Sequence, residues 1–505
     1  MYKKALISFT QPESSEPEAP LVRVLPADLE TPVSIYLKLA DAHSPSFLLE
    51  SVTGGEQVAR YSFIGVGACR MYSLQGESLI IREANGERRV RHGNPFQLLE
   101  EEFLARRRPV IPGLSRFNGG LVGYLGYEAV RWFEPGVASL PAPQGIADGL
   151  FLEADCVVAF DHAFGKVILI SHPDPALPFP RRQQLARQKL DDLQNRLMQP
   201  LPALPLSSLA SGSSKTEWVY PPREKFLQAV ERAKQAIYAG EIFQVVLSQC
   251  FTRRTSAHPF EIYRTLRRLN PSPYMFYLDF AAWHEDQPLR LIGASPEMHV
   301  RLTGRNAIIR PIAGTRPRGA TELQDIEMEK DLLADPKERA EHIMLVDLAR
   351  NDLGRVCTFG SVHLREKMSI ERYSHVMHIV SQVEGRLRPD INAFGLMRAT
   401  FPAGTVSGAP KVRAMQIIGE LEDQPRGVYA GAVGYFAFDG NMDTCIAIRT
   451  LVMQGDRIAL QAGAGIVADS LPEREHEEIL NKARALAQAV ELAEDKETNY
   501  ADHSR

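Results

Sequence analysis

The chain has 505 residues, of which 44% are hydrophobic and 24% charged, and its net charge is −4. This length suggests about two to four domains, and the composition is that of a globular protein rather than a disordered or low-complexity chain. The near-neutral balance argues against a nucleic-acid-binding protein or one held on an anionic membrane.

Cysteine usage and hydropathy favour a cytoplasmic protein. Five cysteines are scattered without a C-x-x-C pair, so neither a disulfide framework nor a zinc knuckle is expected. No apolar run approaches the roughly 18 residues that a membrane span needs. The apolar segment after Lys3 and Lys4 is too short for a signal peptide.

The N-terminal half is expected to be rich in strands. Short apolar runs separated by Gly, Asn and Pro continue to about Ile170, with helices predicted at 95–107 and 180–198. Residues 199–216 are rich in Pro, Ser and Ala and look like a linker. The predicted organisation is a lead-in at 1–21, an N-terminal region at 22–198, this linker, a larger C-terminal domain at 217–493 and a polar tail at 494–505.

The C-terminal half alternates helices with strands, which favours an α+β fold with mixed or antiparallel sheets. Helices are predicted at 222–240, 259–269, 336–350, 391–400, 410–420 and 472–493. Strands are predicted at 241–253, 274–280, 289–302, 306–312, 374–385, 428–438, 442–453 and 457–462. The P-loop, dinucleotide-binding, zinc-protease and nucleophile-elbow motifs are all missing.

Two helix starts carry paired acids. In the first, Asp335 and Pro336 occupy N-cap and N1 positions, and Glu338 and Glu341 follow at i and i+3. A simple capping box explains Glu338. Alternatively, two carboxylates on one helix face can share a cation.

The second acidic start has the same form. Ser470 and Glu473 can make a capping box, while Glu475 and Glu478 are again i and i+3, and Lys482 can pair with Glu478. If the two starts converge, the like charges repel by about 4 kcal/mol per contact at 4 Å. A hard cation such as Mg²⁺ with an anionic substrate would relieve this repulsion.

Three glycine-rich turns and one histidine are further candidates for a functional site. The segments 311–319 (PIAGTRPRG), 401–411 (FPAGTVSGAPK) and 461–466 (QAGAGI) are either ordinary turns or places where backbone N–H groups bind an anion. His378 lies on a predicted strand, either as a satisfied core histidine or as a general acid or base.

Seven ordered motifs resemble those of the chorismate-binding enzyme family, and within it the large components that form anthranilate. They are 311–319, 341–352 (EHIMLVDLARND), 401–415 (FPAGTVSGAPKVRAM), 431–436 (GAVGYF), 443–449 (DTCIAIR), 461–466 and 478–483 (EILNKA). The resemblance is dense over about 220–490 and reaches the N-terminal half at 48–51 and 60–65. It implies a regulatory role for the region at 22–198 and a catalytic role for the domain at 217–493.

The resemblance implies a Mg²⁺-dependent lyase. Ammonia would add at C2 of chorismate, the C4 hydroxyl would leave, and pyruvate would be eliminated to give anthranilate, the first step of tryptophan biosynthesis. By the same resemblance Glu341 and Glu478 hold Mg²⁺, with Glu338 and Glu475 in its shell. His378, Thr405 and Lys482 are implied as catalytic residues. The residues implied to bind substrate are Gly314, Thr315, Tyr429, Arg449, Gly463, Ala464 and Gly465.

Two positions select the reaction within this resemblance. Relatives that make 4-amino-4-deoxychorismate carry a lysine where this chain has Ala313, and relatives that activate water carry one where it has Gln244. Neither lysine is present, which fits an attack by ammonia itself. The alternatives are an enzyme that stops at 2-amino-2-deoxyisochorismate, and a non-catalytic tryptophan-sensing paralogue.

The resemblance also implies regulation and a partner. The residues implied to bind tryptophan as a feedback inhibitor are Leu49, Glu50, Ser51, Pro273, Tyr274, Met275, Val433 and Tyr435. An edge strand is the simpler explanation of 48–51. Because the chain lacks an amidotransferase motif, ammonia would come from a glutamine amidotransferase small subunit in a hetero-oligomer, or from free ammonium.

Overall fold

The structure is a computed structural model that describes residues 19–51, 60–137, 143, 145–202, 216–283, 288–373 and 376–502, with side chains to 495. Most of the predicted lead-in (1–21) and linker (199–216) lies outside the described residues. No helix of the described ranges is long and apolar enough to cross a membrane.

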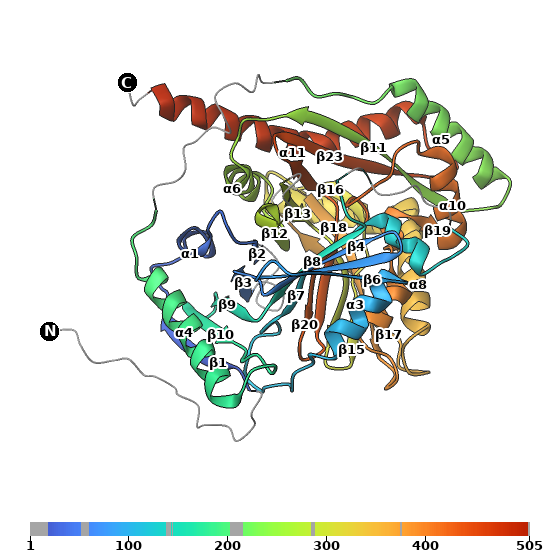
Figure 1. Cartoon of the computed structure of the whole chain (residues 1–505). Helices are drawn as coiled ribbons and strands as arrows, with labels where there is room; N and C mark the ends of the chain where they lie inside the picture. The colour runs from blue at the N-terminus through green and yellow to red at the C-terminus, as the bar shows by residue number, and fades with distance from the viewer. Residues whose placement is uncertain are drawn as a thin grey trace.

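Two large antiparallel sheets form the molecule (Figure 1). The first, in order across the sheet, contains β1 (Leu21–Pro26), β10 (Lys166–Ser171), β9 (Cys156–Asp161), β3 (Tyr61–Val66), β2 (Ser46–Glu50), β12 (Tyr274–Asp279), β13 (Leu289–Ser295), β22 (Thr450–Gln454), β23 (Arg457–Ile466), β11 (Gln244–Arg254) and β19 (Gly408–Ala409). The second contains β16 (Ile312–Pro317), β18 (Val376–Arg386), β15 (Asn306–Ile309), β14 (Met298–Thr303), β21 (Met442–Ile446), β20 (Ala432–Ala437), β7 (Gly120–Leu125), β8 (Gly149–Ala154), β4 (Arg70–Gln75), β5 (Ser78–Glu83) and β6 (Arg88–His92), with β17 (His363–Arg372) paired to β18.

Helices cover the sheets. They are α1 (Pro32–Leu39), α3 (Pro95–Leu104), α4 (Phe179–Leu197), α5 (Arg223–Tyr238), α6 (Pro259–Leu269), α7 (Glu322–Ala334), α8 (Pro336–Gly354), α9 (Ala393–Thr400), α10 (Lys411–Leu421) and α11 (Pro472–Asp502), with short 3₁₀ helices η1 (Tyr127–Trp132), η2 (Ala281–Trp283) and η3 (Gly404–Val406). The predicted α+β class is confirmed.

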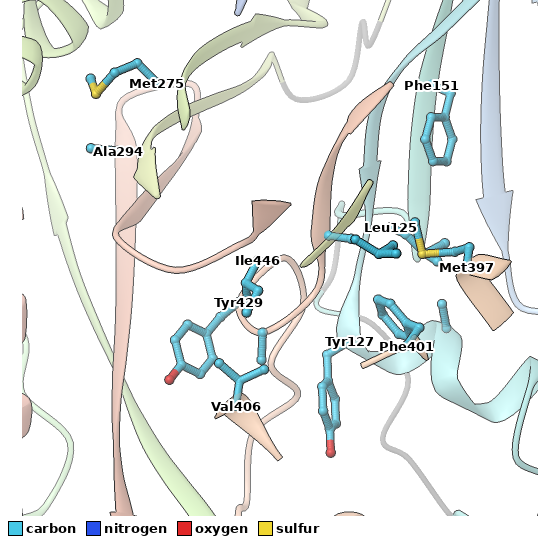
Figure 2. Packing of buried hydrophobic residues seen from close by; sticks show 14 of the residues in the cluster. Leu125, Tyr127, Phe151, Met275, Ala294, Met397, Phe401, Val406, Tyr429 and Ile446 are labelled. Atoms are coloured by element: carbon cyan, nitrogen blue, oxygen red, sulfur yellow. The ribbon is translucent and has the colours of Figure 1, made fainter. Parts of the chain in front are cut away.

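The hydrophobic core lies between the two sheets. Phe63 and Phe276 of the first sheet and Tyr124, Leu152 and Tyr435 of the second belong to one buried cluster. A second, larger cluster joins the sheets to the helices around them, and Figure 2 shows part of it. Burial of this many large side chains is the main stabilising contribution to the fold.

The two halves of the sequence share both sheets. Strands β2 and β12 pair, with Met275 opposite Glu50, and strands β7 and β20 pair, with Tyr124 opposite Val433. Each sheet therefore contains strands from both sides of the predicted 199–216 linker, and the proposed domain boundaries stay predictions.

Two predicted strands are in fact each two strands. The run 289–302 divides into β13 and β14, which lie in different sheets, and 442–453 divides into β21 and β22 in the same way. Pro296 has no N–H to donate to a ladder, so the first strand ends there. Arg449 has φ +52°, a left-handed conformation that stops the second. The chain thus crosses between sheets at 296–297 and 447–449.

The sequence analysis missed α1, α7 and β17. Helix α7 is mostly exposed and lacks a clear apolar stripe, so periodicity gave no signal. Conversely, α11 continues to Asp502, beyond the predicted end at 493.

Candidate active site and effector cavity

The catalytic candidates surround the starts of α8 and α11 and the adjoining ends of β16, β18 and β23. Arg449, Glu478 and Lys482 line one open cleft of about 580 Å³, together with Arg474, Glu477 and Asn481. The cleft therefore brings together a predicted substrate ligand, a predicted metal ligand and a predicted catalytic lysine from separate elements.

The start of α8 confirms the predicted N-cap. The Asp335 carboxylate accepts hydrogen bonds from the N–H groups of Lys337 (2.9 Å) and Glu338 (3.3 Å). The Glu338 side chain does not complete a capping box, because it faces Arg316 at 3.4 Å. Burial and the nearby Glu341 raise the pKa of Glu338. Its carboxylate is thus held at the cleft rather than spent on the helix end.

The start of α11 carries an ion pair and a partly buried acid, and the Ser470 hydroxyl accepts a hydrogen bond from the Val467 N–H. The Glu478 carboxylate pairs with Lys482 at 2.7 Å. Burial raises the pKa of Glu475, the Ser470 hydroxyl opposes that rise, and the Glu478 charge adds to it. The charge of Lys337 lowers the pKa of Glu475, so the start of α8 lies near the start of α11.

The four glutamates do not close on a single point. No group of three or more His, Cys, Asp or Glu side chains among the described residues is arranged to hold a metal. Instead Gln244 donates to Glu341 (3.0 Å) while Arg316 and Lys482 neutralise the neighbouring acids. The four carboxylates nevertheless provide the oxygen donors that Mg²⁺ prefers, so the donor set fits the predicted ion.

His378 lies in the site rather than in the core. On β18 its neighbours Met377 and Ile379 pack into a hydrophobic cluster, while the His378 ring is on the opposite face. Its Nδ1 is 3.0 Å from the Gly314 carbonyl and 3.1 Å from the Thr315 hydroxyl. Burial lowers the pKa of His378, so the ring is neutral at pH 7.

Close backbone approach explains the glycines of β23. A Cβ on Gly463 would lie 2.5 Å from the Tyr429 hydroxyl, and one on Gly465 would lie 2.6 Å from Gln244 Nε2. Ala464 between them is fully buried. Lys482 Nζ donates to the Gly463 carbonyl at 3.0 Å. These contacts place Tyr429, Lys482 and the β23 backbone against one another.

Arg449 is a cation without an anionic partner in the part of the chain described. Burial lowers the pKa of its guanidinium, and only the Tyr429 phenol acts in the other direction. A half-buried guanidinium with no carboxylate beside it favours binding of an anionic ligand. By contrast, Arg318 pairs with Asp325 (2.6 Å) and does not line the cleft, although the motif containing it suggested an anion site.

Glu297 is a functional candidate that the sequence analysis missed. It lies at the crossover between β13 and β14 and is 8% exposed. Burial raises its pKa to about 8, while the Thr405 hydroxyl and the Lys482 charge oppose the rise. Its charge also acts on Tyr373, whose ring packs against His378. Pro296 inside a predicted strand was the available signal, since a proline there marks a break.

The eight residues predicted to bind tryptophan line a single cavity. It has a volume of about 530 Å³ and lies between β2, β12, β20 and β21. Arg301 pairs with Asp443 at 2.8 Å, and the Tyr274 hydroxyl donates to the same carboxylate at 3.0 Å. Leu49–Ser51 therefore form a wall of a cavity and are not an exposed edge.

Comparisons with known proteins show which family the chain resembles along most of its length. Residues 44–488 match the family model described as chorismate binding enzyme. The chain is 49% identical over 474 residues to anthranilate synthase component 1 of Pseudomonas putida, covering 93% of this chain and 94% of that protein. It is 46% identical over 483 residues to the protein of that name from Neisseria meningitidis serogroup B, covering 94% and 96%.

Solved structures show the same fold. The crystal structure of anthranilate synthase component I from Streptococcus pneumoniae superposes with a TM-score of 0.73 at 34% identity, covering 92% of this chain and 98% of that one. The menaquinone-specific isochorismate synthase from Escherichia coli superposes with a TM-score of 0.69 at 20% identity, covering 94% and 96%.

Proposed function

The chain belongs to the chorismate binding enzyme family, in its anthranilate synthase component 1 branch, and we propose that it converts chorismate and ammonia to anthranilate and pyruvate with Mg²⁺, under feedback inhibition by tryptophan. The observation that carries the proposal is the unpaired Arg449 guanidinium beside Glu478 and Lys482 in one cleft. This arrangement suits a dicarboxylate substrate held partly by a divalent cation.

The amination step needs an acid at the C4 hydroxyl. We assign this role to the buried Glu297, because its pKa of about 8 keeps it protonated at pH 7. As ammonia bonds to C2, the ring double bonds shift, the C4–O bond breaks, and Glu297 gives its proton to the departing oxygen. Gln244 lies beside Glu341 and offers no base, so the nucleophile must arrive as neutral ammonia.

Mg²⁺ would be held by Glu341 and Glu478, with Glu338 and Glu475 beside them, and would supply Lewis-acid stabilisation of the substrate carboxylate. The chain's own groups bind the rest of the anion: Arg449 and Lys482 provide positive charge, and Tyr429 with the β23 backbone holds the ring. These contacts orient C2 and C4 before reaction.

Pyruvate elimination needs a base near the C2 hydrogen. His378 is neutral at pH 7, and Gly314 and Thr315 fix its Nδ1 side. We assign the proton removal at C2 to this ring, after which the enolpyruvyl C–O bond breaks and the ring becomes aromatic. Gly314 has φ +73°, and a Cβ there would lie 3.2 Å from a Glu338 carboxylate oxygen, so glycine allows Glu338 to approach the backbone.

Tryptophan inhibition is supported by the effector cavity. Its walls are mostly apolar, and charged groups at one end can meet an amino-acid head group. Inhibition requires that tryptophan bind the inactive arrangement of the protein more tightly than the active one. The ammonia donor would be a glutamine amidotransferase small subunit, consistent with the component 1 naming of the relatives.

The test is a fluorescence assay of the purified chain with chorismate, Mg²⁺ and ammonium, with and without tryptophan. Anthranilate fluorescence that tryptophan suppresses is the expected result. Loss of chorismate without fluorescence would instead identify an enzyme that stops at 2-amino-2-deoxyisochorismate. If chorismate is not consumed at any ammonium concentration, the proposal is wrong.

A further inference from the structure

A second cavity lies behind the proposed acid. It has a volume of about 370 Å³, part of which is open to solvent, and it lies between β14, β15, α8, α9 and η3. We call it the rear cavity. The residues that line it are Glu297, Met298, His299, Ile309, Pro311, Leu345, Leu348, Ala349, Asp352, Thr400, Ala403, Gly404, Thr405 and Ile446. Figure 2 shows Ile446 in the same packed cluster as Val406 and Tyr429.

Glu297 and Thr405 line the rear cavity, and Glu297 also lies near the catalytic cleft. The charge of Lys482, which lines the cleft, acts on the Glu297 carboxyl. The Glu297 backbone is fixed, because the Ile446 N–H donates to the Glu297 carbonyl at 3.1 Å. The acid therefore borders the rear cavity and is close to the lysine of the cleft.

The rear cavity contains polar atoms whose hydrogen bonds to the described residues are poorly formed. His299 Nε2 and Thr405 Oγ1 are both buried and form no hydrogen bond of normal geometry in that part of the chain. The Thr400 backbone acts on the His299 ring, and the Thr405 hydroxyl acts on the Glu297 carboxyl. His299 is 3% exposed, and its other nitrogen, Nδ1, is 3.2 Å from the Thr444 hydroxyl. Buried polar groups are almost always satisfied, by water where the protein offers nothing.

The far wall is polar as well. The Asp352 carboxylate pairs with Lys411 at 2.7 Å, and Lys411 also donates to the Thr400 carbonyl at 3.1 Å. A cavity that is lined by several polar groups and has room for a water molecule is expected to be hydrated. An apolar packing defect would not place poorly paired donors and acceptors on its surface.

We propose that the rear cavity receives the water that forms when the C4 hydroxyl of chorismate leaves, and that His299 and Thr405 hold that water away from the reacting ring. The inference rests on the proposed function. In the step, the C2–N bond forms, the C4–O bond breaks with its electron pair on oxygen, and the Glu297 proton completes a water molecule. The new C2 ammonium group then loses a proton, which replaces the proton that Glu297 gave to the leaving oxygen.

This role explains why the cavity lies beside the acid. The water forms beside Glu297, and if it stayed there it could add back at C4 and reverse the step. Transfer past Thr405 into the rear cavity takes it away from C4. His299 is therefore a positioning residue that acts on the leaving group and not on the ring.

The first experiment fills the cavity. Ala349 lines it from α8 and is 4% exposed, whereas Ala399 on α9 is 5% exposed and does not line it. Ala349→Met should lower the single-turnover rate of chorismate consumption with saturating ammonium by about tenfold or more relative to Ala399→Met, with the chorismate Kd unchanged within about twofold. Equal rates in the two folded variants would overturn the proposal.

A second pair of variants, at His299, tests the proposal without filling the cavity. His299→Gln retains a polar group that can hold water, and His299→Leu does not, so the rate should fall further in the leucine variant. A crystal structure of the full chain gives a readout apart from activity: ordered water within hydrogen-bond distance of His299 Nε2 and Thr405 Oγ1 is expected. A dry cavity would refute the inference, while wild-type protein that leaves chorismate intact would refute the proposed function instead.

Discussion

The effector cavity and the catalytic cleft are built on the same two sheets but differ in how their walls are held. The cavity walls are strands in register: Met275 pairs with Glu50, and Val433 pairs with Cys445. The cleft is made from helix starts, crossovers and strand ends. Strand walls keep their shape without a ligand, because each backbone group is already bonded to its neighbour.

The two regions also differ in charge. In the cavity, Arg301, Asp443 and Tyr274 satisfy one another. In the cleft, Arg449 has no carboxylate partner within the described ranges, and the glutamates crowd together. A preformed cavity whose charges are paired suits selective binding of one ligand. In the cleft, the unpaired charges are free to interact with a charged substrate and a cation. Each of the following predictions separates the two regions.

The largest effect is expected from the acidic helix starts. Glu341→Gln or Glu478→Gln should lower Mg²⁺-supported anthranilate formation by about 10³-fold, because a metal-bound carboxylate accounts for several kcal/mol of charge stabilisation. Steady-state assays over a Mg²⁺ titration measure this. Glu473→Gln, an exposed acid in the same first turn, is the control and should be near normal. Near-normal turnover in either ligand variant would remove the metal assignment, and tryptophan binding should persist in both.

A somewhat smaller loss is expected at His378. His378→Met should lower anthranilate formation by about 10²-fold or more, because a general base is removed, and 2-amino-2-deoxyisochorismate should accumulate. Chromatography of the products distinguishes the two compounds. His363→Met, on the neighbouring strand β17, is the matched control. Unimpaired anthranilate output would contradict the assigned role of the ring.

The pH dependence should report Glu297. Its raised pKa means that the acid is protonated below about pH 8 and charged above it, so kcat/KM per free ammonia should fall about tenfold per pH unit on the alkaline side. In Glu297→Gln this alkaline decrease in kcat/KM should disappear, together with most of the activity. The same raised pKa makes the group's contribution to stability greatest at acid pH and lost as pH rises through about 8. If the alkaline decrease persists in the Glu297→Gln variant, it arises from the titration of a different side chain.

The smallest effect on rate is expected in the effector cavity. Ser51→Phe should place a ring in the cavity and raise the tryptophan concentration for half inhibition by about 100-fold, while kcat and the KM for chorismate stay within about twofold. Inhibition curves and tryptophan titration calorimetry measure this. If inhibition is unchanged in the folded variant, tryptophan binds elsewhere. If kcat or the KM for chorismate changes as well, the cavity and the catalytic cleft are structurally coupled.

Local sequence patterns were enough to find many elements and much of the cleft. The N-cap at Asp335, the helix of 259–269 and the close-approach glycines at 463 and 465 depend on spacing and residue type within a few positions. Motif resemblance then linked these segments to a family. For the same reason the strand ends at Pro296 and Arg449 were missed, since a continuous apolar run conceals a change of sheet.

The amino-acid sequence by itself determined the α+β class, the helix starts that carry the acids, and the types of side chain available for chemistry. Only the tertiary structure decided which strands from the two halves share a sheet, that the chain changes sheet at 296–297, and that Glu297 is buried beside Thr405. The reason is physical: helix capping and turn preference depend on neighbours along the chain, whereas strand pairing, burial and the pKa of Glu297 depend on segments that only folding brings into contact.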